Sequence, residues 1–458
     1  MYPVPARQIV STRLAKLFTL AAMSLGYGVV QLDVTIVNTA LNSIGTSLGG
    51  GVSELQWVVS TYTIAFAALI LTAGTLGDRF GAKNIFMGGF AIFTSILIAA
   101  RALQGVGAAI LVPNSLALLT HAYGNETERD RAVGVWAAGA SLALTAGPLI
   151  GGGLIEIAGW RSIFLVNLPI GLGALWLTWR YATDTTRTQH PLDLPGQAAA
   201  IGMLGVLAGA IIEGGRLGWT NAWVVAGFGA FVMLAALFLV QERRAPYPML
   251  PLSLFAHRMF ALTSLVGLLV NIAFYGLIFV FSLYFQQINH WSSFATGLAF
   301  VPMMGAVLPV NLVAPYLAER IGAPTVIALG ALIAAAGCFG LLGLERGTTY
   351  WAICGQLLAM GGGLGLLVPP LTSTLLGSVD KARSGVAAGV LNSTRQTGSV
   401  LGVAVFGSLI GQADAFLFGA RIALIISTML LIAAAAAIMS SELSLAHRRP
   451  ARAAHRSR

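Results

Sequence analysis

The chain alternates between long apolar runs and short polar segments along almost its whole length. Most runs hold about 20 residues, the length that crosses the hydrocarbon core of a bilayer as an α-helix. Short stretches rich in glycine, proline and charge separate them. The pattern predicts an all-α integral membrane protein with fourteen spanning helices, at residues 17–41, 55–76, 85–100, 101–121, 132–156, 162–181, 194–213, 222–241, 260–285, 294–317, 324–344, 350–376, 385–411 and 420–441.

The positively charged residues divide unevenly between the two sides of such a membrane. If the N-terminus lies in the cytoplasm, 20 Lys and Arg residues fall in the inner segments and four in the outer segments. Short cytoplasmic segments are enriched in Lys and Arg, so this imbalance supports an even number of spans. We therefore expect a multi-pass protein of the cytoplasmic (inner) membrane with both termini in the cytoplasm.

Composition agrees with the bilayer as the main partner of the chain. Hydrophobic residues make up 57% of the 458 residues and charged residues 9%, whereas a soluble domain carries about 25% charged residues. The net charge of +10 is scattered, and only the tail HRRPARAAHRSR is a basic cluster. Such a tail is typical of a membrane-surface anchor, so we expect no nucleic-acid partner. Cys338 and Cys354 lie in or beside apolar runs and are expected to be small buried residues rather than a disulfide.

The third predicted helix is unusually short. Residues 85–121 must supply two spans and the turn between them. If the turn lies at Thr94 and Ser95, the third helix rises only about 15 Å, half of a bilayer core. Two explanations remain open: the turn dips into the protein, or the span is damaged relative to a full-length relative.

The chain also repeats a loop. The sequence LGDRFGA at 76–82 recurs as LAERIGA at 317–323, each time between two apolar runs on the predicted cytoplasmic side. Parallel repeats of this kind are typical of transporters made of two similar halves. The repeat predicts an N-terminal half at 1–190, a two-helix insert at 191–245 and a C-terminal half at 246–458, and it singles out Glu319, Arg320 and Gly322 as the second-half loop.

Four local patterns resemble a known family. They are LDVTIVNTAL (32–41), GTLGDRFGAK (74–83), RALQGVGAA (101–109) and GASLALTAGPLIGGGL (139–154). Together they resemble the major facilitator superfamily, and more closely its fourteen-helix drug:proton antiporters. The resemblance covers almost the whole chain. It implies a major facilitator fold of two six-helix halves with two extra central helices, and proton-coupled export of lipophilic drugs or antibiotics.

Two of these patterns contain groups that suit a moving membrane protein. In the loop at 74–83, small glycines permit close contact between helices, and the basic residues hold the loop on the cytoplasmic side. The resemblance implies that this loop is an inner gate, and an ordinary positively charged cytoplasmic turn is the alternative. In the fifth predicted helix, proline removes a backbone hydrogen bond, and glycines leave one face of the helix without side chains. Ordinary helix packing is sufficient to explain this pattern, and the resemblance implies that the helix also seals the central cavity. The gating-loop candidates are Gly74, Gly77, Asp78, Arg79, Gly81 and Lys83, and the antiporter-motif candidates are Gly139, Gly147, Pro148, Gly151 and Gly152.

Charged residues inside predicted spans are the candidates for chemistry. Asp33 in the first helix and Arg101 in the fourth are expected at similar depth, so a charged pair or a shared cavity is feasible. Snorkelling of Arg101 to the outer interface is the alternative. The resemblance makes Asp33 the proton carrier, with Arg101 tuning it. Cavity candidates are Gln104, Asn392, Arg395 and Gln396.

Several functional classes remain as alternatives and others are excluded. A proton-coupled importer or facilitator on the same fold, and a transport-defective relative with a shortened third helix, stay open. The sequence has no H-E-x-x-H and no G-x-x-x-x-G-K-[ST], so we expect no enzyme, no ATP-driven pump, no metal and no cofactor. The expected partners are protons, a lipophilic small molecule and the bilayer, with a periplasmic adaptor protein as a further candidate. One central carboxylate favours a monocation or a neutral compound as substrate over a dication.

Overall fold

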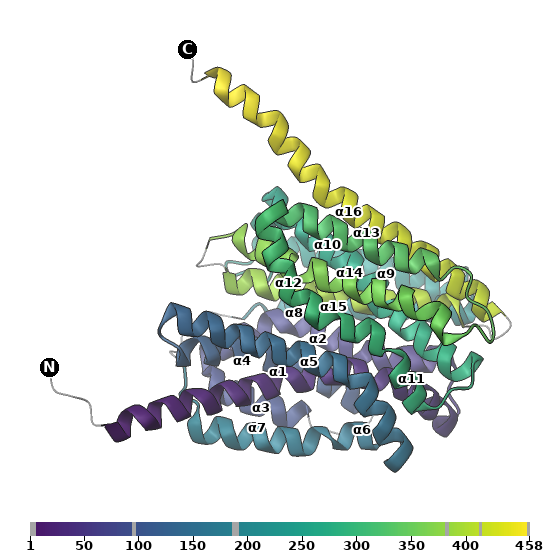
Figure 1. Ribbon diagram of the computed structural model, residues 1–458, viewed down its shortest axis with the longest axis horizontal. Helices are drawn as coiled ribbons and strands as arrows, with labels where there is room; N and C mark the ends of the chain where they lie inside the picture. Colours follow the sequence, from purple (N-terminus) through teal and green to yellow (C-terminus); the bar gives the residue numbers. More distant parts are fainter. Residues whose placement is uncertain (1–5, 94–97, 186–191, 381–383, 412–414, 456–458) are drawn as a thin grey trace.

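The computed structural model describes residues 6–93, 98–185, 192–380, 384–411 and 415–455, and this part of the chain is helical throughout, without strands (Figure 1). Both termini extend from the same end of the bundle, which we call the terminal end; the opposite one is the far end. The helices are α1 (Ala6–Leu48), α2 (Val52–Phe80), α3 (Ala82–Phe93), α4 (Ile98–Ala122), α5 (Glu126–Ala158), α6 (Ser162–Leu165), α7 (Asn167–Tyr181), α8 (Leu194–Leu217), α9 (Ala222–Arg244), α10 (Arg258–Leu283), α11 (Ser293–Ala299), α12 (Val301–Ile321), α13 (Ala323–Gly340), α14 (Tyr350–Gly377), α15 (Ser384–Leu409) and α16 (Phe416–His455).

Twelve helical segments in the described residues are long and apolar enough to cross a membrane. Three of them join consecutive elements: α6 with α7, α10 with the π-helical turn Tyr284–Ile288, and α11 with α12. The other two predicted spans correspond to α3, which has 12 residues, and α15, which has 26 residues but carries the polar stretch NSTRQTGS. The all-helical membrane fold is therefore confirmed, whereas the number fourteen stays a prediction.

The short helix α3 is well packed. Its three phenylalanines, Phe86, Phe90 and Phe93, have no accessible surface. Gly89 and Gly107 let α3 and α4 approach closely, because a Cβ on Gly89 would lie 2.7 Å from the Ile110 side chain. The predicted turn at residues 94–95 lies outside the described residues. A helix of 12 residues rises about 18 Å, and its aromatic face is fully used in the core of the N-terminal half.

The two halves meet along two seams. At one seam α2 packs on α15, and Gln56 near the far end donates hydrogen bonds to the carbonyls of Val403 and Ala404 at 3.0 and 2.8 Å. At the other seam α5 packs on α11, where a Cβ on Gly297 would collide with the Pro148 carbonyl oxygen. The backbones therefore touch at the far end, and the two halves share one apolar core there.

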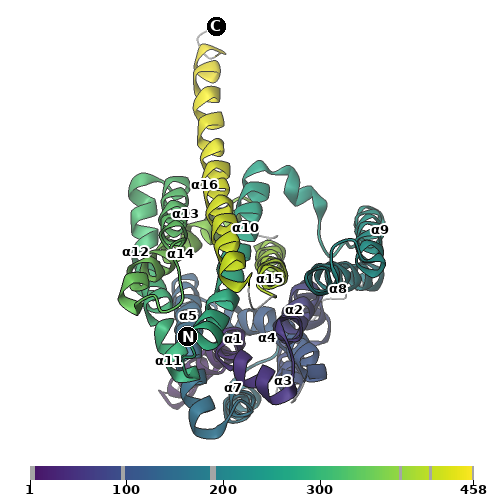
Figure 2. The ribbon, with the colours of Figure 1, turned by 90° about the vertical axis from the view of Figure 1, so that its right-hand side faces the viewer.

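The two helices between the halves cover the first seam. Helix α8 contacts both α2 and α15, and α9 packs on its outer side (Figure 2). Gln197 of α8 donates to the Ala68 carbonyl of α2 at 2.9 Å, and it also hydrogen-bonds Thr72. This placement fits the predicted insert; the limits at residues 190 and 245 remain predictions.

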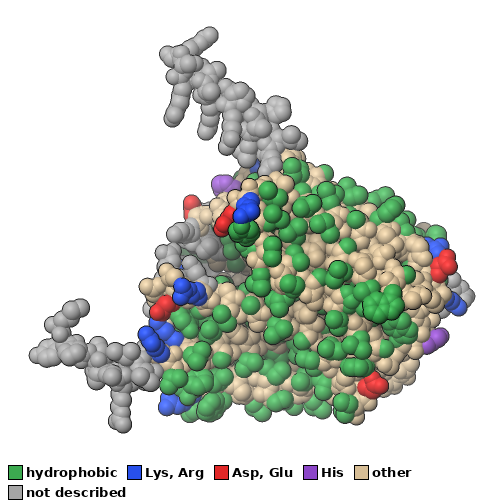
Figure 3. All heavy atoms as spheres, viewed as in Figure 1, with side chains coloured by type: hydrophobic (Ala, Val, Ile, Leu, Met, Phe, Trp, Pro, Cys, Tyr) green, Lys and Arg blue, Asp and Glu red, His purple; other side chains and the backbone are tan. Residues whose placement is uncertain are grey.

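The surface has the distribution of a membrane protein. In Figure 3 apolar side chains cover the middle of the molecule, and charged side chains gather toward its two ends. Large apolar residues such as Trp223, Leu312 and Trp351 are exposed. Because soluble monomers rarely expose large contiguous apolar patches, this surface is suited to contact with lipid. The chain is a multi-pass membrane protein.

Candidate functional site

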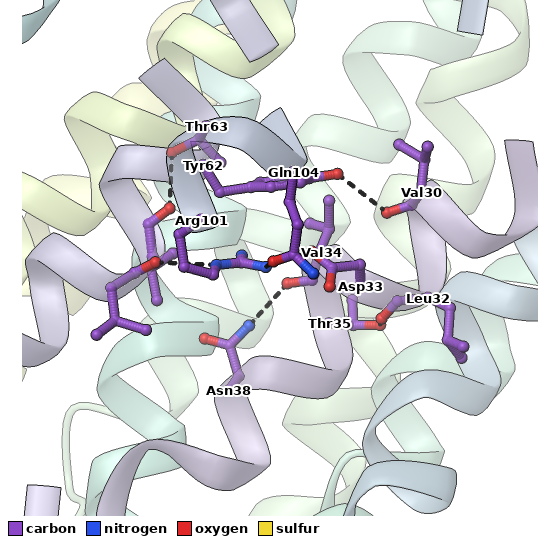
Figure 4. Close-up of polar contacts among 12 residues, drawn as sticks. Val30, Leu32, Asp33, Val34, Thr35, Asn38, Tyr62, Thr63, Arg101 and Gln104 are labelled. Atoms are coloured by element: carbon purple, nitrogen blue, oxygen red, sulfur yellow. Dashed lines mark hydrogen bonds and ion pairs between the residues drawn. The ribbon is translucent and has the colours of Figure 1, made fainter. Parts of the chain in front are cut away.

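An ion pair lies in the middle of the N-terminal half. Asp33 of α1 and Arg101 of α4 have 0% and 2% of their surface exposed, and Arg101 Nη1 donates to Asp33 Oδ2 at 2.6 Å (Figure 4). Arg101 does not extend toward either end of the bundle, so it does not snorkel. The two residues that sequence reasoning placed at similar depth are therefore in direct contact.

The guanidinium of Arg101 is fixed by further contacts. Its Nε donates to the Val58 carbonyl of α2 at 3.2 Å, and Nη1 also donates to Gln104 Oε1 at 3.0 Å. The group lies over the Tyr62 ring at 4.3 Å, a cation–π contact. Helices α1, α2 and α4 thus all contribute to the site. Val58 and Tyr62 were missed in the sequence, since one contributes a backbone atom and the other is one aromatic among many.

The second carboxylate oxygen of Asp33 takes no part in the ion pair. Asp33 Oδ1 is buried and has no hydrogen-bond partner in the structure. Beside the pair is a small cavity with room for about one water molecule, lined by residues of both halves, including Asn38, Tyr62, Arg101, Tyr275 and Ser399. A buried ion pair with one unsatisfied oxygen can be opened by protonation, because the neutral acid no longer attracts the guanidinium.

Three of the other cavity candidates, Asn392, Arg395 and Gln396, make no hydrogen bond or ion pair with Asp33 or Arg101. Arg395 of α15 donates to Thr372 Oγ1 of α14 at 2.8 Å. Asn392 donates to the Ala388 carbonyl of its own helix at 3.0 Å, and the buried Gln396 has an unpartnered Oε1. Gln104, in contrast, belongs to the Arg101 cluster. The four predicted residues therefore form two groups, one in each half.

Gly74 and Gly77, the first two gating-loop candidates, lie where α2 contacts α4. A Cβ on Gly77 would collide with the Asn114 side chain, and a Cβ on Gly74 would lie 3.8 Å from Pro113 Cβ. Asn114 Nδ2 also donates to the Ala73 carbonyl at 3.1 Å. These glycines permit close packing within the N-terminal half, as their residue type predicts.

The end of the loop is anchored by the segment after α7. Gly81 ends α2 at a φ of +92°, which glycine adopts without strain. The Lys83 amide donates to Asp184 Oδ1 at 3.2 Å, and Lys83 Nζ donates to the Ala182 and Trp179 carbonyls at 2.8 and 2.9 Å. Asp184 was not singled out in the sequence. The Arg79 guanidinium is exposed and lies 5.3 Å from the Phe80 ring, and Asp78 lies in the last turn of the same helix.

The second-half loop repeats this backbone. Gly322 ends α12 at a φ of +89°, close to the value at Gly81. Glu319 and Arg320 are exposed, and the Arg320 guanidinium lies 4.3 Å from the Tyr316 ring. The sequence repeat thus corresponds to a repeated helix-ending geometry.

The antiporter-motif residues of α5 lie against both neighbours of that helix. Gly147 and Gly151 face Thr35 and Ile36 of α1, where a larger residue would collide with the side chains. Gly152 instead faces the backbone of Ser293 in the C-terminal half. Pro148 lies between Gly147 and Gly151 in the chain, and a Cβ on Gly139 would lie 3.6 Å from Ser24 Cβ. The motif therefore lets one helix pack tightly on its own half and across the seam at once.

In the described part of the chain, no group of three or more His, Cys, Asp or Glu side chains is arranged to hold a metal ion. Two similar helical halves, with a buried ion pair inside the N-terminal half, are the architecture of a secondary membrane transporter. The chain belongs to the Major Facilitator Superfamily, whose family model matches residues 23–199 and 194–403.

Relatives of known name place the chain in the drug-efflux branch of that superfamily. It is 34% identical to the methylenomycin A resistance protein of Bacillus subtilis over 90% of this chain and 91% of that protein. It is 35% identical to the multidrug resistance protein Stp of Mycobacterium tuberculosis, over 86% and 76% of the two chains. The human organic anion transporter MFSD10 has the same fold, with a TM-score of 0.64 at 16% identity, over 92% of this chain and 99% of that one. The protein is a transporter and not an enzyme.

Proposed function

We propose that the protein exports lipophilic drugs or antibiotics across the cytoplasmic membrane in exchange for protons. The relatives that bear the names of methylenomycin A, cephamycin and puromycin transport or resistance proteins support a drug substrate. Burial of Asp33 against Arg101, with one carboxylate oxygen left unpartnered, is the observation that carries the proton-coupled part of the proposal.

In this mechanism Asp33 is the proton carrier. A proton from outside binds the carboxylate, the neutral acid releases Arg101, and the guanidinium keeps its contacts with the Val58 carbonyl, Gln104 and Tyr62. Each charge that moves inward through the membrane field contributes about 2.3 kcal/mol per 100 mV. Return of Asp33 to its charged form on the cytoplasmic side restores the ion pair.

The two halves would alternate between openings at either end. The far end is closed in this structure, where Asn38 accepts a hydrogen bond from Gln286 at 3.3 Å and another from Ser282. With both termini in the cytoplasm, this end faces outward, and the closed seam corresponds to a state that does not release substrate outside. The packed aromatic face of α3 argues against the transport-defective alternative, because the short helix fills its place in the core.

Efflux from cells that express the protein tests the proposal. A panel of antibiotics is loaded into cells, and their exit is followed with and without an uncoupler. We expect uncoupler-sensitive export of at least one compound, lost in Asp33→Asn and retained in Glu156→Gln, an exposed carboxylate near the far end of α5. Accumulation rather than export would favour the importer, and full coupled export by Asp33→Asn would remove the assigned proton carrier.

A further inference from the structure

Arg395 is a cation that pairs with no acid among the described residues. It lies near the centre of α15, a helix without Asp or Glu. Its guanidinium donates to the neutral Thr372 hydroxyl, and among the described residues no carboxylate pairs with it. Arg keeps its proton in proteins, so Arg395 brings a permanent positive charge into the molecule.

The surroundings of Arg395 place it at the interface between the halves. Ser399, one turn along α15 from Arg395, lines the small cavity beside Arg101 together with Tyr275 of α10. Tyr275 and Tyr27 of α1 both pack against the apolar core of the N-terminal half. Arg395, Tyr27 and Tyr275 keep accessible surface although they lie far from the ends of their helices. Because Ser399 and Tyr275 line a cavity that residues of the N-terminal half also line, Arg395 lies beside the interface between the halves.

Aromatic rings lie near this interface. Trp136 of α5 stacks on Tyr27 with ring centroids 4.3 Å apart. Tyr275 also lines the small cavity beside Arg101, so the Arg101 site and the Arg395 site adjoin. Between them they hold two guanidiniums and one carboxylate, Asp33, and that carboxylate is already paired. The interface thus has one positive charge in excess.

An unpaired cation at this depth is costly unless a ligand or water compensates it. We propose that the transported compound carries a carboxylate that pairs with Arg395 while its apolar body lies against Tyr27, Trp136 and Tyr275. Guanidinium and carboxylate match in planar geometry and form two parallel hydrogen bonds. This inference rests on the proposed export function, and it replaces the expectation of a monocation or neutral substrate, which considered Asp33 without Arg395.

Calorimetric binding to the full chain in lipid nanodiscs tests the inference without any proton gradient. The probes are fusidate, benzylpenicillin and ibuprofen, each beside its own methyl ester. We expect the wild type to bind at least one acid about tenfold or more tightly than its ester. Arg395→Gln should remove that preference and leave ester binding unchanged, whereas Arg395→Lys should keep part of it. The matched control is Arg421→Gln, which removes an arginine near the far end that pairs with Glu345.

Two results would overturn the inference. One is that no acid binds the wild type better than its ester does. The other is that Arg395→Gln weakens the binding of acid and ester equally, while Arg395→Lys folds like the wild type. Efflux separates this inference from the export proposal. If export is sensitive to the uncoupler but acids are not preferred over esters, the carboxylate site is wrong and the export proposal remains. If acids are preferred through Arg395 but no compound is exported, the export proposal is wrong and the carboxylate site remains.

Discussion

Replacing Arg101 with methionine tests how strongly the buried ion pair stabilises the protein. The change removes the 2.6 Å contact with Asp33 and the donors to Val58 and Gln104, while the stem of methionine keeps much of the apolar volume. Asp33 then stays buried without a partner. Removing one member of a buried pair costs about 3–5 kcal/mol, mainly because the remaining charge is uncompensated. We expect Arg101→Met to lower the apparent melting temperature in detergent by several degrees.

Two companion variants give this prediction its control. Asp33→Asn combined with Arg101→Met leaves no charge at the site and should recover most of the lost stability. Arg216 pairs with Glu213 at the same 2.6 Å but is exposed, so Arg216→Met should cost only about 0–1 kcal/mol. If Arg101→Met and Arg216→Met lower the melting temperature equally, or the double variant is no more stable than Arg101→Met, the assigned role of the buried pair is wrong.

Three glycine or amide positions give further predictions in the same melting assay. Gly297→Ala should destabilise the protein, because its Cβ meets the Pro148 carbonyl, whereas Gly229→Ala meets no atom within 4 Å and should be neutral; equal effects would contradict the close seam. Gly81→Ala should cost about 1–2 kcal/mol for its positive φ, and an unchanged melting temperature would contradict it. Gln197→Ala should cost about 1–3 kcal/mol by leaving buried groups of α2 unpaired, and a loss no larger than that of Gly229→Ala would refute this contact.

Hydropathy was sufficient to predict the helices, because a bilayer permits few alternatives for a long apolar run. The repeat located two loops between apolar runs, but the helices before them were expected to end at residues 76 and 317, whereas they continue to Phe80 and Ile321. The sequence could not establish fourteen spans: α15 carries so many polar residues that its apolar character is weak, and α3 is short. The mean hydropathy of a segment depends only on its composition. It does not show whether the polar face of a helix such as α15 is turned toward the other half of the protein.

The site was only partly accessible to sequence reasoning. Asp33 and Arg101 were found because a charge inside an apolar run is costly and because helix rise gives depth. The contacts of Arg101 with Val58 and Tyr62 could not be found, since they depend on how each helix is rotated about its axis. Glu242 was missed as well. It is 3% exposed near the terminal end of α9 and accepts a hydrogen bond from the Leu250 amide at 2.9 Å, but in the sequence it stands in an ordinary charged helix end, QERR.

Asp33 and Arg395 belong to different halves, and this separates their expected effects. Arg101, the partner of Asp33, lies in the same half, so in the proposed cycle protonation of Asp33, rather than movement of the halves, opens the pair. Arg395 lies one turn from Ser399, which lines a cavity shared by both halves, so we expect its surroundings to change as the seam opens. In the proposed cycle, Arg101→Lys should therefore alter the uncoupler sensitivity of efflux and leave the preference for acids over esters unchanged. Arg395→Gln should remove that preference and leave the uncoupler sensitivity of ester efflux unchanged; loss of both properties in either variant would show that proton and substrate sites are not separate.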